Sequence, residues 1–343
     1  MKASTLLDIA QTGALHMDPK VLQTSLSKLE LKSDKGAYRY LTPERLNADT
    51  AKFFEEAIDK MFATYSSAMA ELVGYIRKSR QKPEHLSKAE WKQRTTEEAA
   101  NVASELIPIA AQIPYVSPIR PVQSKAGKQS FKITKSVAPQ TLSPDAEVFQ
   151  LISFAPRNEL ELVANILFEF SSQTSDTIDQ IADGLLYEQR IGVLREYLSS
   201  KRQTALRAAT YEWEITEQLG LALQILAINP SASIAFQEFT PRHGYDVPKL
   251  VEDAGVSELF ERSFDRSYEL FSQLQASGYV EEACLATLLG HRLRWRVSVS
   301  APVLSSIVYQ LPDIRNESAK SLSKKFADSW AQAHPTIASE IGT

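Results

Sequence analysis

One apolar stripe constrains the fold of this chain more than any other feature of its sequence. Between residues 47 and 80, eight large apolar side chains recur mostly at spacings of three and four: Phe54, Ile58, Met61, Phe62, Tyr65, Met69, Leu72 and Ile76. That period places them on one side of an α-helix. Asn47 or Asp49 is positioned to cap the first turn. The stripe therefore predicts a long amphipathic helix that ends near Arg80.

A second helix is expected to pair with the first in antiparallel fashion. It begins at Ser87, has Glu90 in the capping-box position and runs to about Ile113. Further helices are expected at about 158–170, 175–185, 187–201, 217–228, 257–276, 303–311 (stopped by Pro312) and 318–333. A short strand and a turn are expected at 36–46, and strands at 147–154, 209–216 and 291–300, the last two from strict apolar–polar alternation. The sequence predicts an α+β protein that is predominantly helical.

The chain is expected to divide into two domains, because 343 residues exceed the size at which a single core stops growing. Residues 114–146 contain five prolines and four lysines and are the expected linker. The first part, 1–113, would be mainly the helical pair, and the second would be 147–343. The sequence leaves the role of the first 35 residues open.

Composition excludes several classes of protein. The formal net charge of −4 excludes a globally basic nucleic-acid binder, so nucleic acid is not an expected partner. No apolar run reaches the ~18 residues that a membrane span needs, so no membrane is expected. Neither GxGxxG nor GxxxxGK[ST] occurs, which leaves dinucleotide and P-loop sites unsupported. The single cysteine allows no intramolecular disulfide and fits a reducing cytosol, so we expect a cytoplasmic protein.

Three arginines form the first candidate binding feature. Arg292, Arg294 and Arg296 alternate along the last expected strand and therefore share one face. Such a face, which we call the arginine row, could hold a phosphate or an RNA backbone. The alternative is pairing with neighbouring acids, such as Glu281 and Glu282, or with a partner subunit. We favour the alternative, because rows of this kind more often form ion pairs within proteins.

The second candidate feature is the corner QEFTPRHGYDVPKLVEDAG, residues 237–255. Arg242 and His243 could contact a phosphate or a pyrimidine. The structural interpretation pairs them with Glu252 or Asp253, and we favour it.

Three further residues of the corner have structural roles of their own. Gly244 would permit a tight turn, Asp246 would accept backbone N–H bonds, and Pro248 would start the next helix.

Cys284 lies in an apolar helical context and is expected to be a buried residue with a raised pKa. The five histidines show no metal-ligand spacing, so neither a metal nor a catalytic residue is expected.

Four segments, taken in order, resemble one known family. They are GAYRYLTPE with the helix after it, the alanine-rich WKQRTTEEAANVASELIPIAA, the stretch from ATYEWEITEQLG through the corner, and SGYVEEACLATLLGHRLRWRVSVS with the closing helix. Together they resemble the flavin-dependent thymidylate synthases, in particular the long forms with two tandem copies of the domain. The resemblance covers most of residues 36–336, and its most specific motif is the Gly-Tyr-Asp-Val-Pro corner. It implies two degenerate synthase-like domains, the first of them truncated.

Members of that family make dTMP from dUMP with a methylene-folate carbon, reduced FAD and NADPH, at sites between subunits. The resemblance implies arginines for the flavin and dUMP phosphates, since a guanidinium fork matches a phosphate. The family's Arg-His-Arg triplet falls on Ile228, Asn229 and Pro230. Gln237 is the one polar residue that fits the pattern. In the later family helix, the Asn, Arg, His and last Arg fall on Ala301, Val303, Ile307 and Pro312.

These departures lead to three hypotheses. The first is a divergent homologue that binds no cofactor by itself and serves as a structural or regulatory subunit, either as a homo-oligomer or with a companion chain that carries the missing first part. The second is an active FAD-dependent synthase whose arginines come from another subunit. The third is a repurposed nucleotide or nucleic-acid binding module that uses the arginine row. Gln237, Arg242, His243 and the arginine row are the candidate substrate-binding residues.

Overall fold

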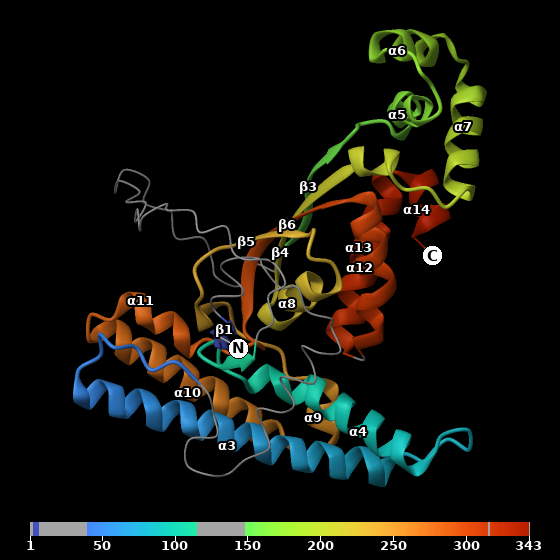
Figure 1. Ribbon diagram of the computed structural model, residues 1–343. Helices are drawn as coiled ribbons and strands as arrows, with labels where there is room; N and C mark the ends of the chain where they lie inside the picture. Colours follow the sequence, from blue (N-terminus) through green and yellow to red (C-terminus); the bar gives the residue numbers. More distant parts are fainter. Residues whose placement is uncertain (1–2, 7–39, 115–147, 315, 343) are drawn as a thin grey trace.

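The protein consists of a layer of long helices, a four-stranded antiparallel sheet, and three helices beyond the far end of the sheet (Figure 1). The computed structural model describes residues 3–6, 40–114, 148–314 and 316–342. The observed class is α+β and mostly helical, as the sequence predicts.

Helix α3 (Ala48–Ser79) carries the apolar stripe, and all eight of its members are buried. Asn47 caps it, because the Asn47 side chain accepts a hydrogen bond from the backbone of Thr50 at 2.8 Å. Helix α4 (Lys88–Ala103) begins with the expected capping box, in which Ser87 and Glu90 each accept a hydrogen bond from the other's backbone N–H. Both helix starts are therefore confirmed.

The expected end of the second helix near Ile113 is wrong. Helix α4 ends at Ala103, and a 3₁₀ turn, η1 (Ser104–Leu106), follows it. The backbone then leaves the helix because it pairs with a distant turn: Ile109 N donates to Thr287 O at 2.8 Å, and Leu289 N donates to Ile107 O at 2.9 Å. Strand β2 (Gln112–Pro114) pairs antiparallel with β1 (Ala3–Thr5).

The sheet has the order β3-β4-β6-β5, and all of its neighbours are antiparallel. Its strands are β3 (Phe149–Ala155), β4 (Thr210–Gln218), β5 (Ser233–Phe236) and β6 (Arg292–Ser300). Three of the four are expected from the sequence, and β5 is not. Of the strand expected at 36–46, Tyr40 forms an isolated bridge to Ala111, and residues 36–39 lie outside the described part of the chain.

The register between β4 and β6 explains the two-sided character of the sheet. Trp213 lies opposite Val297, and Ile215 opposite Trp295, and all four side chains are buried. The polar positions alternate with them and lie on the other face. The confirmed alternation thus places the arginine row on one face and Trp295 on the other.

The remaining helices lie in the helical layer, beside the sheet and beyond its far end (Figure 1). They are α5 (Leu162–Glu169), α6 (Ser175–Gly184), α7 (Tyr187–Ser199), α8 (Leu219–Ile228), α9 (Lys249–Asp253), α10 (Ser257–Ala276), α11 (Val280–Ala283), α12 (Ala301–Gln310), α13 (Glu317–Ala333) and α14 (Pro335–Ile341). The helix expected at about 158–170 is present as a 3₁₀ turn (Glu159–Glu161) followed by α5. The apolar helix expected to stop at Pro312 also does so: α12 ends at Gln310, and Pro312 lies in a 3₁₀ turn (Leu311–Ile314). The sequence did not predict α14.

Buried apolar side chains from both parts of the chain form one continuous core. The cluster includes residues of 46–111 and of 160–337, and α3 packs against α10 across it. The expected linker at 114–146 lies, except for Pro114, outside the described residues, so the domain boundaries stay a prediction.

One local arrangement occurs twice. Helix α4 with η1, and α11 with its 3₁₀ turn (Cys284–Ala286), each lead into a turn, and the two turns pair through an antiparallel bridge between Pro108 and Leu288. Ala111 pairs with Tyr40 as His291 pairs with Tyr245. In this correspondence Pro108 matches Leu288 and Ala111 matches His291, so Glu105 matches Leu285.

Candidate functional site

The two segments that the resemblance assigns to cofactor binding meet in the structure. Asn229 follows α8, and its side-chain amide donates to the hydroxyl of Ser306 on α12 at 3.1 Å. The side-chain oxygen Oδ1 of Asn229 accepts from the backbone N–H of Ser231 at 3.0 Å. Ile228 is partly buried against the core, and Pro230 is exposed. The positions that the resemblance assigns to a cationic triplet thus form a turn in which both ends of the Asn229 side-chain amide are hydrogen-bonded.

The facing positions on α12 are apolar and closed to solvent. Ala301, Val303 and Ile307 are 0%, 8% and 1% exposed. A guanidinium at these positions would be buried without a counter-charge, at a cost of several kcal/mol. These three positions therefore belong to the core and offer no group that could bind a phosphate.

The arginine row pairs within the chain, but not with the acids suggested by the sequence. Arg296 lies opposite Glu214 in the β4–β6 register and forms an ion pair with it at 3.0 Å. Arg294 lies opposite Thr216 and donates to its hydroxyl at 3.4 Å. Arg292 forms an ion pair with Asp246 of the corner at 3.2 Å.

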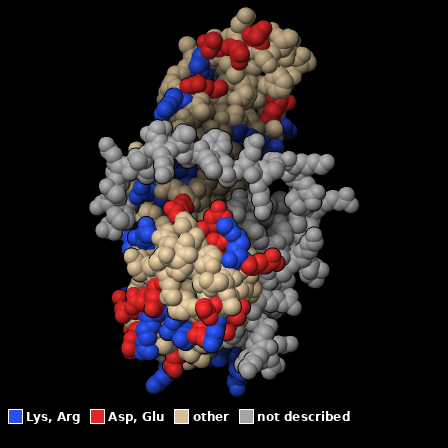
Figure 2. Space-filling model, turned by 90° about the vertical axis from the view of Figure 1, so that its left-hand side faces the viewer, with Lys and Arg blue, Asp and Glu red and all other residues tan. Residues whose placement is uncertain are grey.

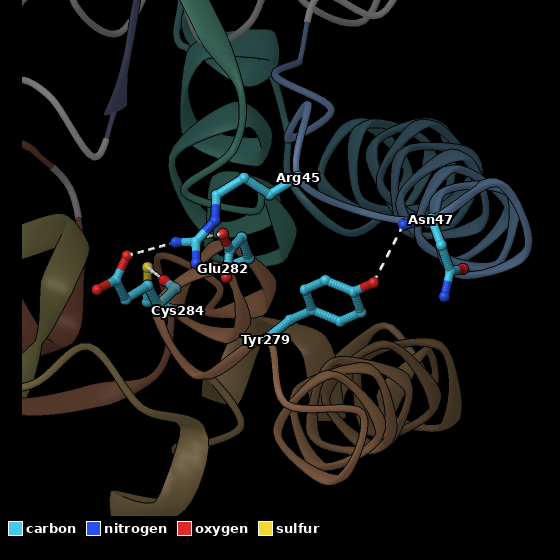
Figure 3. Close-up of polar contacts among 6 residues, drawn as sticks. Arg45, Asn47, Tyr279, Glu282 and Cys284 are labelled. Atoms are coloured by element: carbon cyan, nitrogen blue, oxygen red, sulfur yellow. Dashed lines mark hydrogen bonds and ion pairs between the residues drawn. The ribbon is translucent and has the colours of Figure 1, made fainter.

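Glu281 and Glu282 instead bind Arg45, at 2.8 and 3.3 Å (Figure 3). The same region joins the two parts of the chain a second time, because the Tyr279 hydroxyl accepts from the backbone N–H of Asn47 at 3.2 Å. On the face that Figure 2 presents, basic and acidic side chains are interspersed over the helical layer. This part of the surface neutralises its own charge.

Cys284 lies next to these acids and donates its thiol to the Glu281 carbonyl at 3.0 Å. Burial first, and the Glu282 carboxylate second, raise the pKa of the thiol to about 11. The side chain is half-buried, less than the sequence suggests, whereas the direction of the pKa shift agrees. The thiol is therefore not activated as a nucleophile.

Arg242 in the corner is exposed and donates to the Gln275 side chain at 2.7 Å, with its guanidinium 5.5 Å from the centre of the Phe271 ring. The expected pairing with Glu252 or Asp253 is absent for Arg242. Gln237 is exposed, and its backbone N–H donates to the Arg294 carbonyl at 3.0 Å. The structure thus brings Gln237 next to the arginine row, and it places the Arg242 side chain against Phe271 and Gln275 of α10.

Gly244 is the pivot of the corner. Its φ of 73° and ψ of −163° lie in a region that only glycine adopts freely. Its carbonyl accepts from the backbone of Arg292 at 2.9 Å. Asp246 binds the Arg292 side chain rather than local backbone, and Pro248 directly precedes α9, as expected. The corner is thereby fixed to the first residue of β6.

Beside this corner lies a polar cleft of about 560 Å³. Its walls come from the end of α3, from α4, from the corner and from the start of α13. Its charged lining residues are Arg80, Glu98, Asp246, Lys249, Asp253, Glu317 and Lys320. Gln218 and Asn316 also line it, and both residues line a smaller cavity of about 30 Å³ as well. We call this smaller space the inner cavity.

Buried polar groups line the inner cavity. They are Asn101, Glu105, Gln218, Gln224 and Asn316, each less than one-tenth exposed. Among the described residues, four of their side-chain atoms have no hydrogen-bond partner: the acceptors Asn101 Oδ1, Glu105 Oε2 and Gln224 Oε1, and the donor Gln218 Nε2. Buried polar atoms are almost always paired, so such a group of exceptions marks a candidate site.

Glu105 is the central group of the inner cavity. Its other oxygen, Oε1, accepts from the Asn316 amide at 3.3 Å, and its backbone carbonyl accepts from Gly290 at 2.9 Å. Gly290 permits this approach, since a Cβ there would lie 2.8 Å from the Glu105 Cβ. Burial raises the pKa of Glu105 well above its ordinary value, and the amides of Asn316 and Gln218 offset only part of that rise.

Sequence reasoning missed this cluster. The available signal was Glu105 itself, a charged residue in the otherwise apolar run ASELIPIAA. Its partner Asn316 lies 211 residues away, so no local pattern connects the two.

The described residues contain no group of three His, Cys, Asp or Glu side chains placed to hold a metal ion. His291 is fully buried, accepts from the backbone N–H of Leu288 at 2.9 Å, and has its pKa lowered to about 3 by burial. It is therefore a neutral core histidine. In the part of the chain that the structure covers, no helix is both long and apolar enough to cross a membrane.

The fold and the site thus define a mostly helical α+β protein with a polar cleft at its central corner. No protein-family model matches the chain, and no curated protein matches it. Among solved structures it is similar to the UMP/dUMP methylase PolB from Streptomyces cacaoi, whose crystal structure has 5-Br dUMP bound. The two chains share 12% identity with a TM-score of 0.46, over 57% of this chain and 94% of that one.

Proposed function

We propose that this chain is a divergent homologue of the flavin-dependent thymidylate synthases that binds no flavin by itself and works as a structural or regulatory subunit. One observation carries this proposal: the positions that the resemblance assigns to cofactor binding hold apolar side chains. Ile228, Val303 and Ile307 stand where the family resemblance asks for cations, and Ala301 stands where it asks for an asparagine; the three on α12 are buried. The partner would be a second copy of the chain or a companion chain.

The partners of the arginine row within the chain favour a structural role for it over a nucleic-acid binding site. Arg292 and Arg296 form ion pairs within the chain, and Arg294 donates to Thr216. A phosphate would have to displace these partners before it could bind. The formal net charge of −4 gives no general attraction for a polyanion.

Flavin binding tests the proposal directly. The full chain is purified, incubated with FAD, desalted, and examined for flavin absorbance. We expect a colourless protein and no saturable FAD binding in the micromolar range. Stoichiometric flavin in the isolated chain would overturn the proposal. A yellow complex that forms only with a companion chain would favour instead an active synthase whose cationic groups come from another subunit.

A further inference from the structure

We propose that the cleft and the inner cavity together bind a small primary amine, whose ammonium group is held by Glu105, Asn101 and Gln224. This inference does not depend on the relationship to thymidylate synthases. It rests on buried acceptors, on local charge and on the size of the space.

Three of the four open atoms are oxygens that accept hydrogen bonds, and the fourth, Gln218 Nε2, is a donor. Asn101 donates its amide nitrogen to the Ile314 carbonyl, which leaves Asn101 Oδ1 as its free end. Gln224 Oε1 and Glu105 Oε2 are open in the same way among the described residues. An unpaired buried acceptor costs about 1–3 kcal/mol, so a ligand with several N–H donors relieves more than one such cost. An ammonium group offers three donors from one atom.

The charges around the inner cavity favour a cation over a neutral donor. The carboxyl groups of Glu217 and Asp246 lie close enough to raise the pKa of Glu105 further. Arg292 already pairs with Asp246, and the positive charges of Lys325 and Arg292 lower the pKa of Glu217. The groups that shift the pKa of Glu105 are its burial, two amides and two carboxyl groups, and none of them is a cation. An ammonium ion would supply that missing counter-charge.

The chemistry of the three acceptor oxygens argues against a metal ion as the occupant. Two of the three acceptors are neutral amide oxygens, and the described residues hold no cluster of three metal-ligating side chains. A calcium ion takes six to eight oxygen ligands, and magnesium demands octahedral geometry. A primary ammonium needs only the three acceptors that are present.

The volumes of the two spaces favour a ligand with a small charged end and a larger remainder. The inner cavity of about 30 Å³ admits one group of the size of water or ammonium. The adjoining cleft of about 560 Å³ has room for the carbon skeleton, and Gln218 and Asn316 line both spaces. The site therefore selects an amine at the end of a small molecule, with the remainder directed toward the corner.

The local repeat provides an internal comparison. Leu285 occupies the position that corresponds to Glu105 and is 4% exposed, the same as Glu105. An apolar side chain therefore suits this position of the turn, and the turn itself does not require a carboxyl group. The carboxyl is found only in the copy whose neighbours are Asn101, Gln224 and Asn316.

Isothermal titration calorimetry with the full chain at neutral pH tests the proposal. The probe is propylammonium. Tetramethylammonium has the same charge and no donors, propanol has one donor and no charge, and magnesium tests the metal alternative. The variants are Glu105→Gln, Gln224→Met, which removes one open acceptor at similar volume, and Glu188→Gln as a matched loss of an exposed carboxylate on α7, which lines neither space.

We expect propylammonium to bind and the other three probes not to bind. Glu105→Gln should weaken the affinity about tenfold or more, Gln224→Met several-fold, and Glu188→Gln less than about twofold. Absence of propylammonium binding, equal weakening in Glu105→Gln and Glu188→Gln, or tighter binding of magnesium would each overturn the proposal. If Glu105→Gln fails to fold, Gln224→Met decides alone: unchanged affinity in that variant would overturn the proposal.

Discussion

Replacing Glu105 by glutamine is expected to stabilise the protein at neutral pH and to reduce the dependence of its stability on pH. Glu105 is fully buried in the folded state, where its pKa lies well above the ordinary value of 4.5. In the unfolded chain the same carboxyl ionises near that ordinary value. Between the two pKa values, unfolding therefore releases a proton, and a rise in pH favours the unfolded state.

The magnitude follows from this linkage. Each pH unit between the unfolded and the folded pKa lowers the free energy of unfolding of the wild type by about 1.4 kcal/mol through this one group. The loss begins near pH 4.5 and stops once the pH exceeds the folded pKa. Glutamine does not titrate and can still accept a hydrogen bond from Asn316. The difference in stability between variant and wild type should therefore grow with pH across this window.

The assay is urea unfolding of both proteins at about pH 5, 6 and 7, followed by tryptophan fluorescence or circular dichroism. The pKa of Glu217 is also raised by burial, but that group titrates in both proteins and cancels in the difference. Glu105→Leu provides a second variant, because Leu285 occupies the matching turn. Parallel curves of stability against pH for wild type and variant would refute the reasoning, since they would mean that Glu105 ionises equally in the folded and unfolded states.

Four further predictions follow from single features. Gly244→Val should lower stability by roughly 1–3 kcal/mol, because its backbone conformation suits glycine alone; an unchanged melting temperature would contradict this. Arg296→Ala should change stability by only ~0–1 kcal/mol, since its ion pair with Glu214 is exposed, and it should leave the retention of the protein on a nucleic-acid column as it was; a loss of retention would identify a ligand site. Ser87→Ala should cost about 1 kcal/mol through loss of the capping box, measured by urea unfolding with Ser79→Ala as a control near the end of the preceding helix. The Cys284 thiol, with a pKa of about 11, should react with iodoacetamide at pH 8 about 100-fold more slowly than a thiol of ordinary pKa 9.0, because the rate follows the thiolate fraction; a rate like that of free cysteine would show that the thiol is not shielded.

Local patterns in the sequence were sufficient for most of the elements. The stripe from Phe54 to Ile76 predicts α3, and the Ser87–Glu90 pair predicts the start of α4, because helix period and capping depend on neighbours within one turn. The end of α4 could not be placed in this way. The apolar run after Ala103 continues to look helical, although Pro108 was a signal against it. The bonds that end the helix come from Thr287 and Leu289, which lie far away in the sequence.

The candidate site shows the same limit more strongly. Alternation predicts that the three arginines share a face, but it does not give the register of β6 against β4, and the register is what pairs Arg296 with Glu214. Nearest acids in the sequence, Glu281 and Glu282, were therefore the wrong partners. The inner cavity depends on still longer separations, since the residues that surround Glu105 come from β4, α8 and the start of α13.

The packing of α3 against α10 has a consequence for the synthesis of the chain. The buried stripe of α3 is complete once residue 80 has been made, but the helix that covers much of it ends at Ala276, and the paired turn ends near His291. At ordinary rates of translation, the intervening stretch takes on the order of 10–40 s to synthesise. During that interval the nascent chain presents Phe54, Phe62 and their neighbours with only part of their final covering. We therefore expect its production in cells to depend on chaperones that bind exposed apolar helices.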